Sequence, residues 1–456
     1  MSHARARVSD NGTVPFAAVN FLGVFAPLRE IRSFRGFAVA LLFWAATVQA
    51  ESPWAVPIRG EPFRADVLAV DANWQVTLAI GRERKVMPAA DLVKWGRCAE
   101  QGRGGSVVLA DGSLLAADLA MADERQVAVD SDSLGTLKIP LEALAGVIFR
   151  PPTDPQRRDA LVDRLALAKE DADQLLLENG DTLSGLLKGV ADEIVQIKTA
   201  AGPIEVKTDR ILAIVFNPSL RTIKPRTTVA PNAAAPGAAA GRGSVEAWVG
   251  LADGSRLLAT RLVVEGDRMT LTAAAQTWKA STKSLVFVQP LGGRAVYLSD
   301  LKPVEYRQTP LLDLPWPYRA DRNVTGGRLR VAGRLYLKGL GVHSAARLVY
   351  ELDGARGEGR ETRGQAGGRP NVRVTGRFAA LVAIDDSTAG RGSVRFRVLV
   401  DGRERFASPV LRGGDRPVPV SVDLAGAKRL ELVVDYADQG DVLDHADWLD
   451  ARITRD

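Results

Sequence analysis

The chain has 456 residues, of which 46% are hydrophobic, 25% are charged and 6% are aromatic, and its formal net charge is +6. These values are typical of a soluble globular protein with about two to four domains. Its arginines are scattered, whereas nucleic-acid binding requires a clustered basic surface, so we expect no nucleic-acid partner. The single cysteine, Cys98, excludes an intramolecular disulfide and a zinc site built on several thiolates.

Residues 1–50 are predicted to be a secretory signal peptide. Arg32 and Arg35 precede the apolar run at residues 37–48, and small residues at 48–50 favour cleavage after Ala50. The apolar run is shorter than a membrane-spanning helix requires. A second apolar stretch at residues 14–28 leaves two alternatives, a start codon farther downstream or an uncleaved membrane anchor. We therefore expect a secreted or periplasmic protein.

A repeated pattern predicts the organisation of residues 51–293. Three copies begin with VLADGSLLAADL, LLENGDTLSGLL and VGLADGSRLLATRL and end at Phe149, Phe216 and Val288, and a more divergent copy occupies residues 63–96. Each copy joins a tight Asp-Gly or Asn-Gly turn to short strands and a closing apolar segment. We predict one small, barrel-like antiparallel sheet per copy, similar to an Sm or SH3 barrel, packed against its neighbours. The predicted units are two copies in 51–152 and one each in 178–226 and 244–293.

Two connectors interrupt the repeated pattern. Residues 153–177 are predicted to form a helix, because Leu161, Leu165 and Ala168 share one face and Asp154-Pro155 is a suitable start. Residues 227–243 contain mainly Ala, Pro and Gly and have no apolar periodicity, so we expect a flexible linker.

Residues 294–456 are predicted to form a β-sandwich. Apolar residues alternate with polar ones in four long segments, which gives each strand one buried and one exposed face. Asp401-Gly402 lies between two of these segments and predicts a hairpin. The alternating sets are Phe378, Ala380, Val382 and Ile384; Val394, Phe396, Val398 and Val400; Val418, Val420, Val422 and Leu424; and Leu430, Leu432, Val434 and Tyr436. The fold class is therefore all-β, with small β-repeats followed by a sandwich.

Several motifs of this region occur in an order that resembles the NPCBM family of carbohydrate-binding modules, which are found beside glycoside hydrolases. The motifs are YLSDLKPV from Tyr297, KGLGVHS from Lys338, AIDD from Ala383, GSVRFRVLVDG from Gly392 and DHADWLDA from Asp444. The resemblance implies a jelly-roll or galactose-binding-like sandwich that recognises sugars. Two departures are Ala383, where the family usually has glycine, and an extra Gly/Arg-rich stretch at residues 354–373.

Sugar recognition requires an aromatic ring for the apolar face of a pyranose and fixed hydrogen-bonding groups for its hydroxyls. The sequence offers both in one cluster, with two further aromatic residues in the loop DLPWPYRADRN. The alternative is a structural cluster with Trp448 in the core, because strand alternation places Trp448 and Asp447 on opposite faces. The candidate ligand-binding residues are His343, Asp444, His445, Asp447, Trp448, Trp316 and Tyr318.

No catalytic centre is evident in the sequence. The chain has three histidines and no G-x-S-x-G nucleophile motif, and most aspartates of the C-terminal region lie at turns or strand ends. No cofactor is expected. Carboxylates at Asp435, Asp438, Asp441 and Asp444 crowd together as a structural calcium site would, but their spacing matches no fixed loop motif.

We therefore predict an exported, non-catalytic protein that binds a glycan or polysaccharide through its C-terminal sandwich. Two alternatives remain open: an envelope protein in which the sandwich makes protein contacts, or a glycoside hydrolase accessory protein or enzyme with an unrecognised carboxylate pair.

Overall fold

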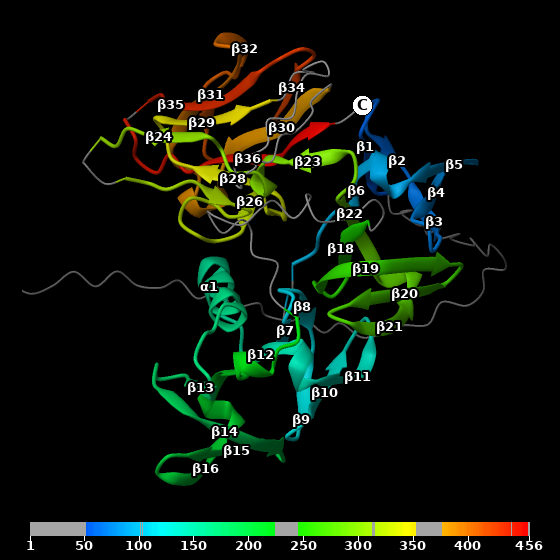
Figure 1. Cartoon of the computed structure of the whole chain (residues 1–456), viewed down its shortest axis with the longest axis vertical. Coiled ribbons are helices and arrows are strands. Elements are labelled where there is room, and N and C mark those ends of the chain that lie inside the picture. The colour runs from blue at the N-terminus through cyan, green and yellow to red at the C-terminus, as the bar shows by residue number, and fades with distance from the viewer. Residues whose placement is uncertain are drawn as a thin grey trace, which may run out of the picture. The chain divides into compact units, whose positions relative to one another are not determined.

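The computed structural model describes residues 52–100, 102, 104–223, 245–311, 315–352, 376–438 and 440–454. The predicted signal peptide, the predicted linker at 227–243 and the Gly/Arg-rich stretch at 354–373 lie outside these residues. Glu51–Asp456 forms one compact unit. Antiparallel strands make up most of the described chain, which confirms the all-β prediction (Figure 1). Within the described residues no helix has the length and apolarity needed to cross a membrane.

The N-terminal part consists of four copies of one small antiparallel unit, as the repeated pattern predicted. The first copy contains β1 (Trp54–Pro57), β2 (Phe63–Arg64), β3 (Asp66–Val70), β4 (Gln75–Ile80), β5 (Glu83–Pro88) and β6 (Leu92–Gly96). The second contains β7 (Ser106–Leu109), β8 (Leu114–Ala116), β9 (Asp118–Ala122), β10 (Gln126–Ser131), β11 (Gly135–Pro140) and β12 (Leu144–Ile148). The third contains β13 (Asp173–Leu177), β14 (Thr182–Ala191), β15 (Ile194–Thr199), β16 (Gly202–Lys207) and β17 (Ile211–Val215). The fourth contains β18 (Glu246–Leu251), β19 (Arg256–Glu265), β20 (Arg268–Ala273), β21 (Gln276–Ser281) and β22 (Leu285–Leu291).

In copies three and four, one long strand (β14 or β19) takes part in two pairings, whereas in copies one and two the corresponding stretch is divided into two strands, β2 and β3 or β8 and β9. In the fourth copy, the first half of β19 pairs with β18 and the second half pairs with β20, with a register shift between Ala259 and Arg261. A short 3₁₀ helix, η5 (Thr282–Ser284), then returns the chain so that β22 pairs with β18. The equivalent 3₁₀ helices are η1 (Ala89–Asp91), η2 (Leu141–Ala143) and η3 (Thr208–Arg210). Register shifts of this kind bend a sheet, and bending lets a small sheet cover its own apolar face.

The four copies contact one another with approximate twofold symmetry. The final strands of copies one and four pair (β6 with β22), and those of copies two and three pair in the same way (β12 with β17). The second long strands also meet in equivalent places, β3 with β19 and β9 with β14. If copies one and two are exchanged with copies three and four, the pairings between copies one and four become those between copies three and two. This arrangement is what duplication of a two-copy unit would produce.

Copies two and four meet reciprocally at their Asp-Gly-Ser turns. The Ser255 hydroxyl accepts a hydrogen bond from Ala116 N at 2.9 Å, and the Ser113 hydroxyl accepts one from Leu258 N at 2.8 Å. Both serines are fully buried. The recurring ADGS motif therefore makes the turn within each copy and also joins two copies.

The connecting helix α1 (Pro155–Ala166) is shorter than predicted. The Asp154 carboxylate caps it by accepting a hydrogen bond from Arg157 N at 2.7 Å. The expected continuation to residue 177 is wrong, since Asp173–Leu177 forms strand β13. This strand pairs on both sides, with β14 and β17, and both of its faces are buried. A short strand that is buried on both faces shows no alternation of polar and apolar residues, so its sequence pattern does not distinguish it from a buried helix.

The C-terminal part is a sandwich of two six-stranded antiparallel sheets. One sheet has the order β25 (Arg319–Ala320), β28 (Gly339–Val342), β36 (Ala446–Thr454), β30 (Arg377–Ile384) and β34 (Val418–Asp423), with β23 (Ala295–Tyr297) paired to β36. The other has the order β24 (Glu305–Gln308), β29 (Ala346–Glu351), β35 (Arg429–Tyr436), β31 (Ser393–Val400) and β32 (Arg403–Ala407), with β33 (Leu411–Arg412) paired to β31. A separate hairpin joins β26 (Leu329–Val331) to β27 (Arg334–Tyr336), and the remaining 3₁₀ helices of the chain are η4 (Pro218–Leu220), η6 (Leu298–Asp300) and η7 (Asp386–Thr388).

The predicted alternation places the core between the two sheets. Phe378 and Phe396 come from different sheets, and both are fully buried in the core with Trp448. The rings of Trp448 and Phe396 pack edge to face, with centroids 5.1 Å apart. Asp401-Gly402 forms the predicted hairpin, with positive φ at both residues. One predicted core position differs, because Tyr436 at the end of β35 is 55% exposed.

Candidate functional site

Two motifs a hundred residues apart in the sequence lie side by side in the fold. Strand β28, from KGLGVHS, pairs with β36, from DHADWLD, so that Gly341 lies opposite Asp447 and Val342 opposite Ala446. His343 and His445 flank this pairing. A side chain at Gly341 would lie 2.4 Å from the carbonyl oxygen of Arg322, so only glycine lets the neighbouring loop approach this closely.

Three rings gather at the end of these strands. Trp316 stacks on His343, with ring centroids 4.9 Å apart and planes 8° from parallel. His445 lies beside both, 6.1 Å from Trp316 and 6.0 Å from His343. Trp316 is half-buried, whereas His343 and His445 are 3% and 6% exposed. The fold thus stacks one partly accessible indole on His343, beside His445, and the two histidines lie next to the ends of different strands.

The loop that carries Trp316 is held by hydrogen bonds to the sandwich. Trp316 N donates to Gln308 Oε1 at 3.1 Å, and its carbonyl oxygen accepts from the Tyr306 hydroxyl. The side-chain amide of Gln308 also donates to the carbonyl oxygen of Ser344, at 3.4 Å. Tyr318 packs against Tyr306, with centroids 5.1 Å apart, and borders the core. Trp316 is therefore a ring of the cluster, and Tyr318 supports the loop behind it.

Both imidazoles are neutral at neutral pH. Burial, together with repulsion from His445, lowers the pKa of His343 to about 4, and burial lowers the pKa of His445 as well. His445 Nδ1 hydrogen-bonds the Ser387 hydroxyl at 3.0 Å, and His343 Nδ1 lies 3.5 Å from the Ser344 hydroxyl. Neither Nε2 atom makes a hydrogen bond to the described residues. Each ring therefore retains one nitrogen that can donate to, or accept from, a ligand.

A second set of residues, which the sequence patterns did not single out for this role, fixes the position of His445. The Asp385 carboxylate accepts hydrogen bonds from Ser387 N, Asn323 Nδ2 and Arg330 N at 2.8–2.9 Å. Asp385 N donates to the carbonyl oxygen of His445 at 2.9 Å. Asp385 belongs to the AIDD motif, but its hydrogen-bond partners Asn323 and Arg330 are distant in sequence, so the motif alone does not indicate this supporting role.

Asp444 directly precedes His445 in the chain and is fully buried. Its Oδ1 accepts a hydrogen bond from Ser393 N at 2.8 Å, while its Oδ2 has no partner among the described residues. Burial raises the pKa of Asp444 to about 6. Asp444 therefore positions the turn before β36 and changes its charge near pH 6.

This pKa predicts a pH-dependent stability difference between the wild type and Asp444→Asn. Because the folded-state pKa of Asp444 is raised, the unfolded chain loses this proton first, and stability falls as pH rises from about 4 to the folded value. Asparagine cannot ionise but keeps the oxygen that accepts from Ser393 N. Urea denaturation at pH 4 and pH 7 should show Asp444→Asn gaining stability relative to wild type at the higher pH. An unchanged difference at the two pH values would contradict the assigned pKa.

Asp447 and Trp448 do not belong to the accessible part of the site. Trp448 is 0% exposed and fills the core between the sheets. Asp447 is also 0% exposed and lies on the opposite face of β36, where burial and the neighbouring Asp385 raise its pKa well above the usual value. The prediction that Asp447 and Trp448 bind the ligand is therefore corrected, because neither side chain reaches the surface.

The four crowded aspartates do not converge on a metal site. Asp435 pairs with Arg397, Asp438 pairs with Arg412, and Asp444 is buried. Within the described part of the chain, no group of three His, Cys, Asp or Glu residues has a geometry that could hold a metal ion.

The fold and the ring cluster define the C-terminal part as a β-sandwich module with a ring-lined site at one end of its strands. Residues 294–360 and 370–454 match the family model of the NPCBM/NEW2 domain. The match covers the C-terminal region of the chain, which therefore resembles an NPCBM/NEW2 domain.

Two curated proteins share sequence with this chain. One, named as an endo-alpha-N-acetylgalactosaminidase of Renibacterium salmoninarum, is 27% identical over 197 residues, which are 39% of this chain and 12% of that protein. The other, alpha-1,3-galactosidase B of Akkermansia muciniphila, is 29% identical over 134 residues, which are 29% of this chain and 15% of that protein. The match therefore spans only a small part of either relative.

The chain is also similar to solved structures, two of which are of proteins from Clostridium perfringens. CBM51 of GH95 in complex with methyl-galactose is 25% identical, with 35% of this chain and 99% of that chain covered and a TM-score of 0.29. CBM51-2 with INT domains of ZmpB, in complex with GlcNAc, is 26% identical, with 41% and 36% covered and a TM-score of 0.29.

Proposed function

We propose that the C-terminal domain binds carbohydrate at the cluster of Trp316, His343 and His445, which we call the ring site. The observation that carries this proposal is the half-buried Trp316 stacked on a neutral histidine next to a second neutral histidine. An indole covers the apolar face of a pyranose, and neutral imidazoles form directional hydrogen bonds with hydroxyls. The family match to a carbohydrate-binding type of domain supports the same conclusion.

The protein is proposed to be non-catalytic. Asp385 and Asp447 are neighbouring carboxyl groups and both are buried, whereas hydrolysis of a glycosidic bond requires two carboxyls that face a cleft. The relatives are named as glycosidases, but the matched stretch is a small part of each. We propose that this stretch corresponds to a binding module, and that the protein is exported, as the pattern of residues 1–50 suggests.

A structural role for the same rings is the alternative. It is favoured by the burial of His343 and His445, which leaves Trp316 as the accessible member of the cluster. In that case the sandwich would serve protein contacts and would bind no sugar.

Replacing Trp316 by alanine should separate the two roles. If the ring site binds sugar, Trp316→Ala removes the platform and abolishes binding, while the half-buried position leaves the thermal midpoint nearly unchanged. We expect dissociation constants of about micromolar to millimolar for the wild type, because a single shallow site supplies only about 4 to 8 kcal/mol. A glycan array followed by calorimetric titration with galactose and N-acetylgalactosamine, which the names of the relatives suggest, provides the measurement.

Trp54→Ala is the matched control, because Trp54 is a surface tryptophan, 48% exposed, in the first copy. It should bind as the wild type does. Failure of the wild type to bind any glycan of the array, with a lowered midpoint for Trp316→Ala, would identify the cluster as structural.

A further inference from the structure

One position breaks the twofold pattern of the repeats. Leu114 follows the Asp-Gly-Ser turn of the second copy, whereas Arg256 follows the same turn of the fourth copy. These two residues are register partners where β8 meets β19, and they are 3% and 5% exposed. A cation therefore occupies a buried position that the twin copy fills with leucine.

The guanidinium of Arg256 is buried away from any carboxylate partner in the described part of the chain. No ion pair or side-chain hydrogen bond joins it to the described residues. Its burial lowers the pKa of Arg256. Since an unpaired buried charge is strongly unfavourable, such a position requires a compensating negative charge.

A second guanidinium, that of Arg328, belongs to the same junction. Leu114, the register partner of Arg256, packs in one apolar cluster with Leu161 of α1, and Asp159 of α1 accepts a hydrogen bond from Arg328 N. The hydrogen bonds of Arg328 are made by its main chain, from Arg328 N to Asp159 Oδ2 at 2.8 Å and from Arg330 Nη1 to the Arg328 carbonyl oxygen at 3.4 Å. Within the described residues its side chain makes none. Burial, then repulsion from Arg322 and Arg256, lowers the pKa of Arg328 to about 9.

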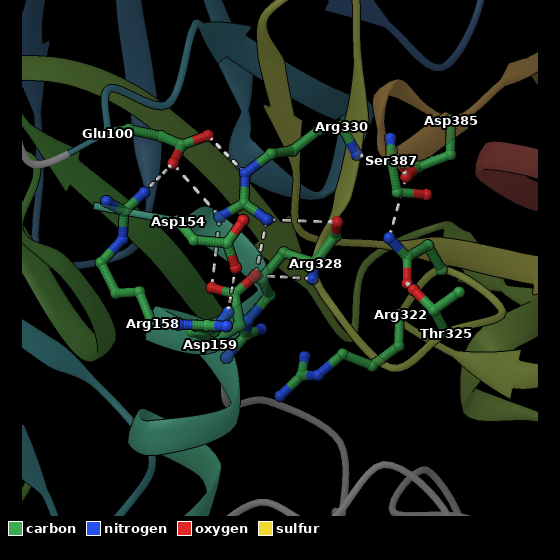
Figure 2. A network of polar contacts seen from close by, with 12 residues as sticks. Glu100, Asp154, Arg158, Asp159, Arg322, Thr325, Arg328, Arg330, Asp385 and Ser387 are labelled. Carbon is green, nitrogen blue, oxygen red and sulfur yellow. Dashed lines mark hydrogen bonds and ion pairs between the residues drawn. The ribbon is translucent and has the colours of Figure 1, made fainter. Parts of the chain in front are cut away.

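The carboxylates of this region are already engaged (Figure 2). Asp159 and Glu100 bind Arg330, Glu100 also binds Arg158, and Asp163 binds Arg322. The carboxylates of Glu100, Asp159 and Asp163 are thus taken up by Arg158, Arg322 and Arg330 where the fourth copy, α1 and the sandwich meet. Among the described residues, the guanidiniums of Arg256 and Arg328 are left without an ion-pair partner.

We propose that Arg256 and Arg328, with Arg322 beside them, bind a divalent oxyanion of the sulfate or phosphate class. The planar fork of a guanidinium donates two parallel hydrogen bonds to such an anion, and two forks can neutralise its two charges. The anion would join the repeats to the sandwich. This site is separate from the ring site and does not depend on sugar binding there.

The thermal midpoint of the full chain in sodium sulfate tests the proposal. Sulfate should be compared with sodium chloride at equal ionic strength and at low millimolar concentrations, about 1–10 mM, where the general stabilising effect of sulfate is small. The wild type should show a saturable rise in sulfate only. Arg256→Leu and Arg328→Leu should each lose this rise. In chloride, Arg256→Leu should melt at or above the wild-type midpoint, because it restores the residue of the twin position.

Arg261→Leu is the matched control, since Arg261 is an exposed arginine on the same strand, and it should keep the rise. N-acetylglucosamine 6-sulfate, compared with N-acetylglucosamine, distinguishes a glycan-borne sulfate from a free anion, and a rise with either sulfate source supports the site. Equal midpoints in sulfate and chloride, with no response to the sulfated sugar, would overturn the proposal. So would a rise that survives in Arg256→Leu.

Discussion

Replacing Trp448 by alanine is expected to lower the free energy of unfolding by about 3–5 kcal/mol, the usual cost of truncating a buried tryptophan. Trp448 is 0% exposed and its ring contacts Phe396 and Phe378, from both sheets. Its removal would leave a cavity in the middle of the sandwich, where the surrounding strands cannot collapse to fill it. Since a loss of this size is a large part of the stability of a typical domain, the sandwich should be marginal or unfolded at 37 °C.

Urea denaturation followed by tryptophan fluorescence and circular dichroism measures this loss. Trp316→Ala and Trp54→Ala remove indoles of the same size from half-buried or exposed positions, and each should cost far less. A loss below about 1 kcal/mol for Trp448→Ala would be inconsistent with a core position.

The second large effect is expected for Arg330→Met. The side chains of Arg330 and Asp159 are 11% and 2% exposed, and the guanidinium also bonds Glu100 at 2.7 Å. Without Arg330, the buried carboxylate of Asp159 would lose its ion-pair partner and keep the hydrogen bond from Arg328 N, and the loss of a buried ion-pair partner costs about 3–5 kcal/mol. Because the main chain of Arg330 also holds Asp385, and Asp385 holds the segment around His445, ligand binding at the ring site should weaken as well.

The effect of Arg330→Met should depend on pH. Burial alone would raise the pKa of Asp159, but the hydrogen bonds and charge of Arg330 outweigh it and lower the pKa. A folded-state pKa below the unfolded value, about 3.9, means that the stabilisation is present above that pH and is lost as pH falls through the folded value. The difference between wild type and variant should therefore shrink below about pH 4.

Arg307→Met is the control for this series, because Arg307 is an exposed arginine on β24 of the same sandwich. It should cost little at any pH. Equal losses for Arg307→Met and Arg330→Met would show that the buried ion pair contributes nothing specific.

The strands of the sandwich and their inward faces could be predicted from the residue pattern alone. Alternation at period two has one physical solution, a strand with one buried face, so the sets that include Phe378, Phe396 and Leu430 could be assigned without coordinates. The repeated Asp-Gly-Ser and Asn-Gly turns likewise marked the copies, because few residues other than glycine accept their backbone angles. The pattern was ambiguous at Asp173–Leu177, where a strand buried on both faces does not alternate.

Which of the candidate residues form the ring site depends on contacts between distant parts of the chain. Trp316 stacks on His343 because a loop folds back over the end of β28, and no spacing in the sequence records that contact. His445 is one of the three rings, and Asp444 precedes it in the chain. Trp448 lies in the core and Asp447 lies on the other face of β36, because adjacent residues of a strand point to opposite faces. The reciprocal contact of Ser113 and Ser255, and the burial of Arg256, also depend on packing between copies. Local sequence specifies the faces of a strand, while the neighbours of each face are set by contacts between residues far apart in the chain.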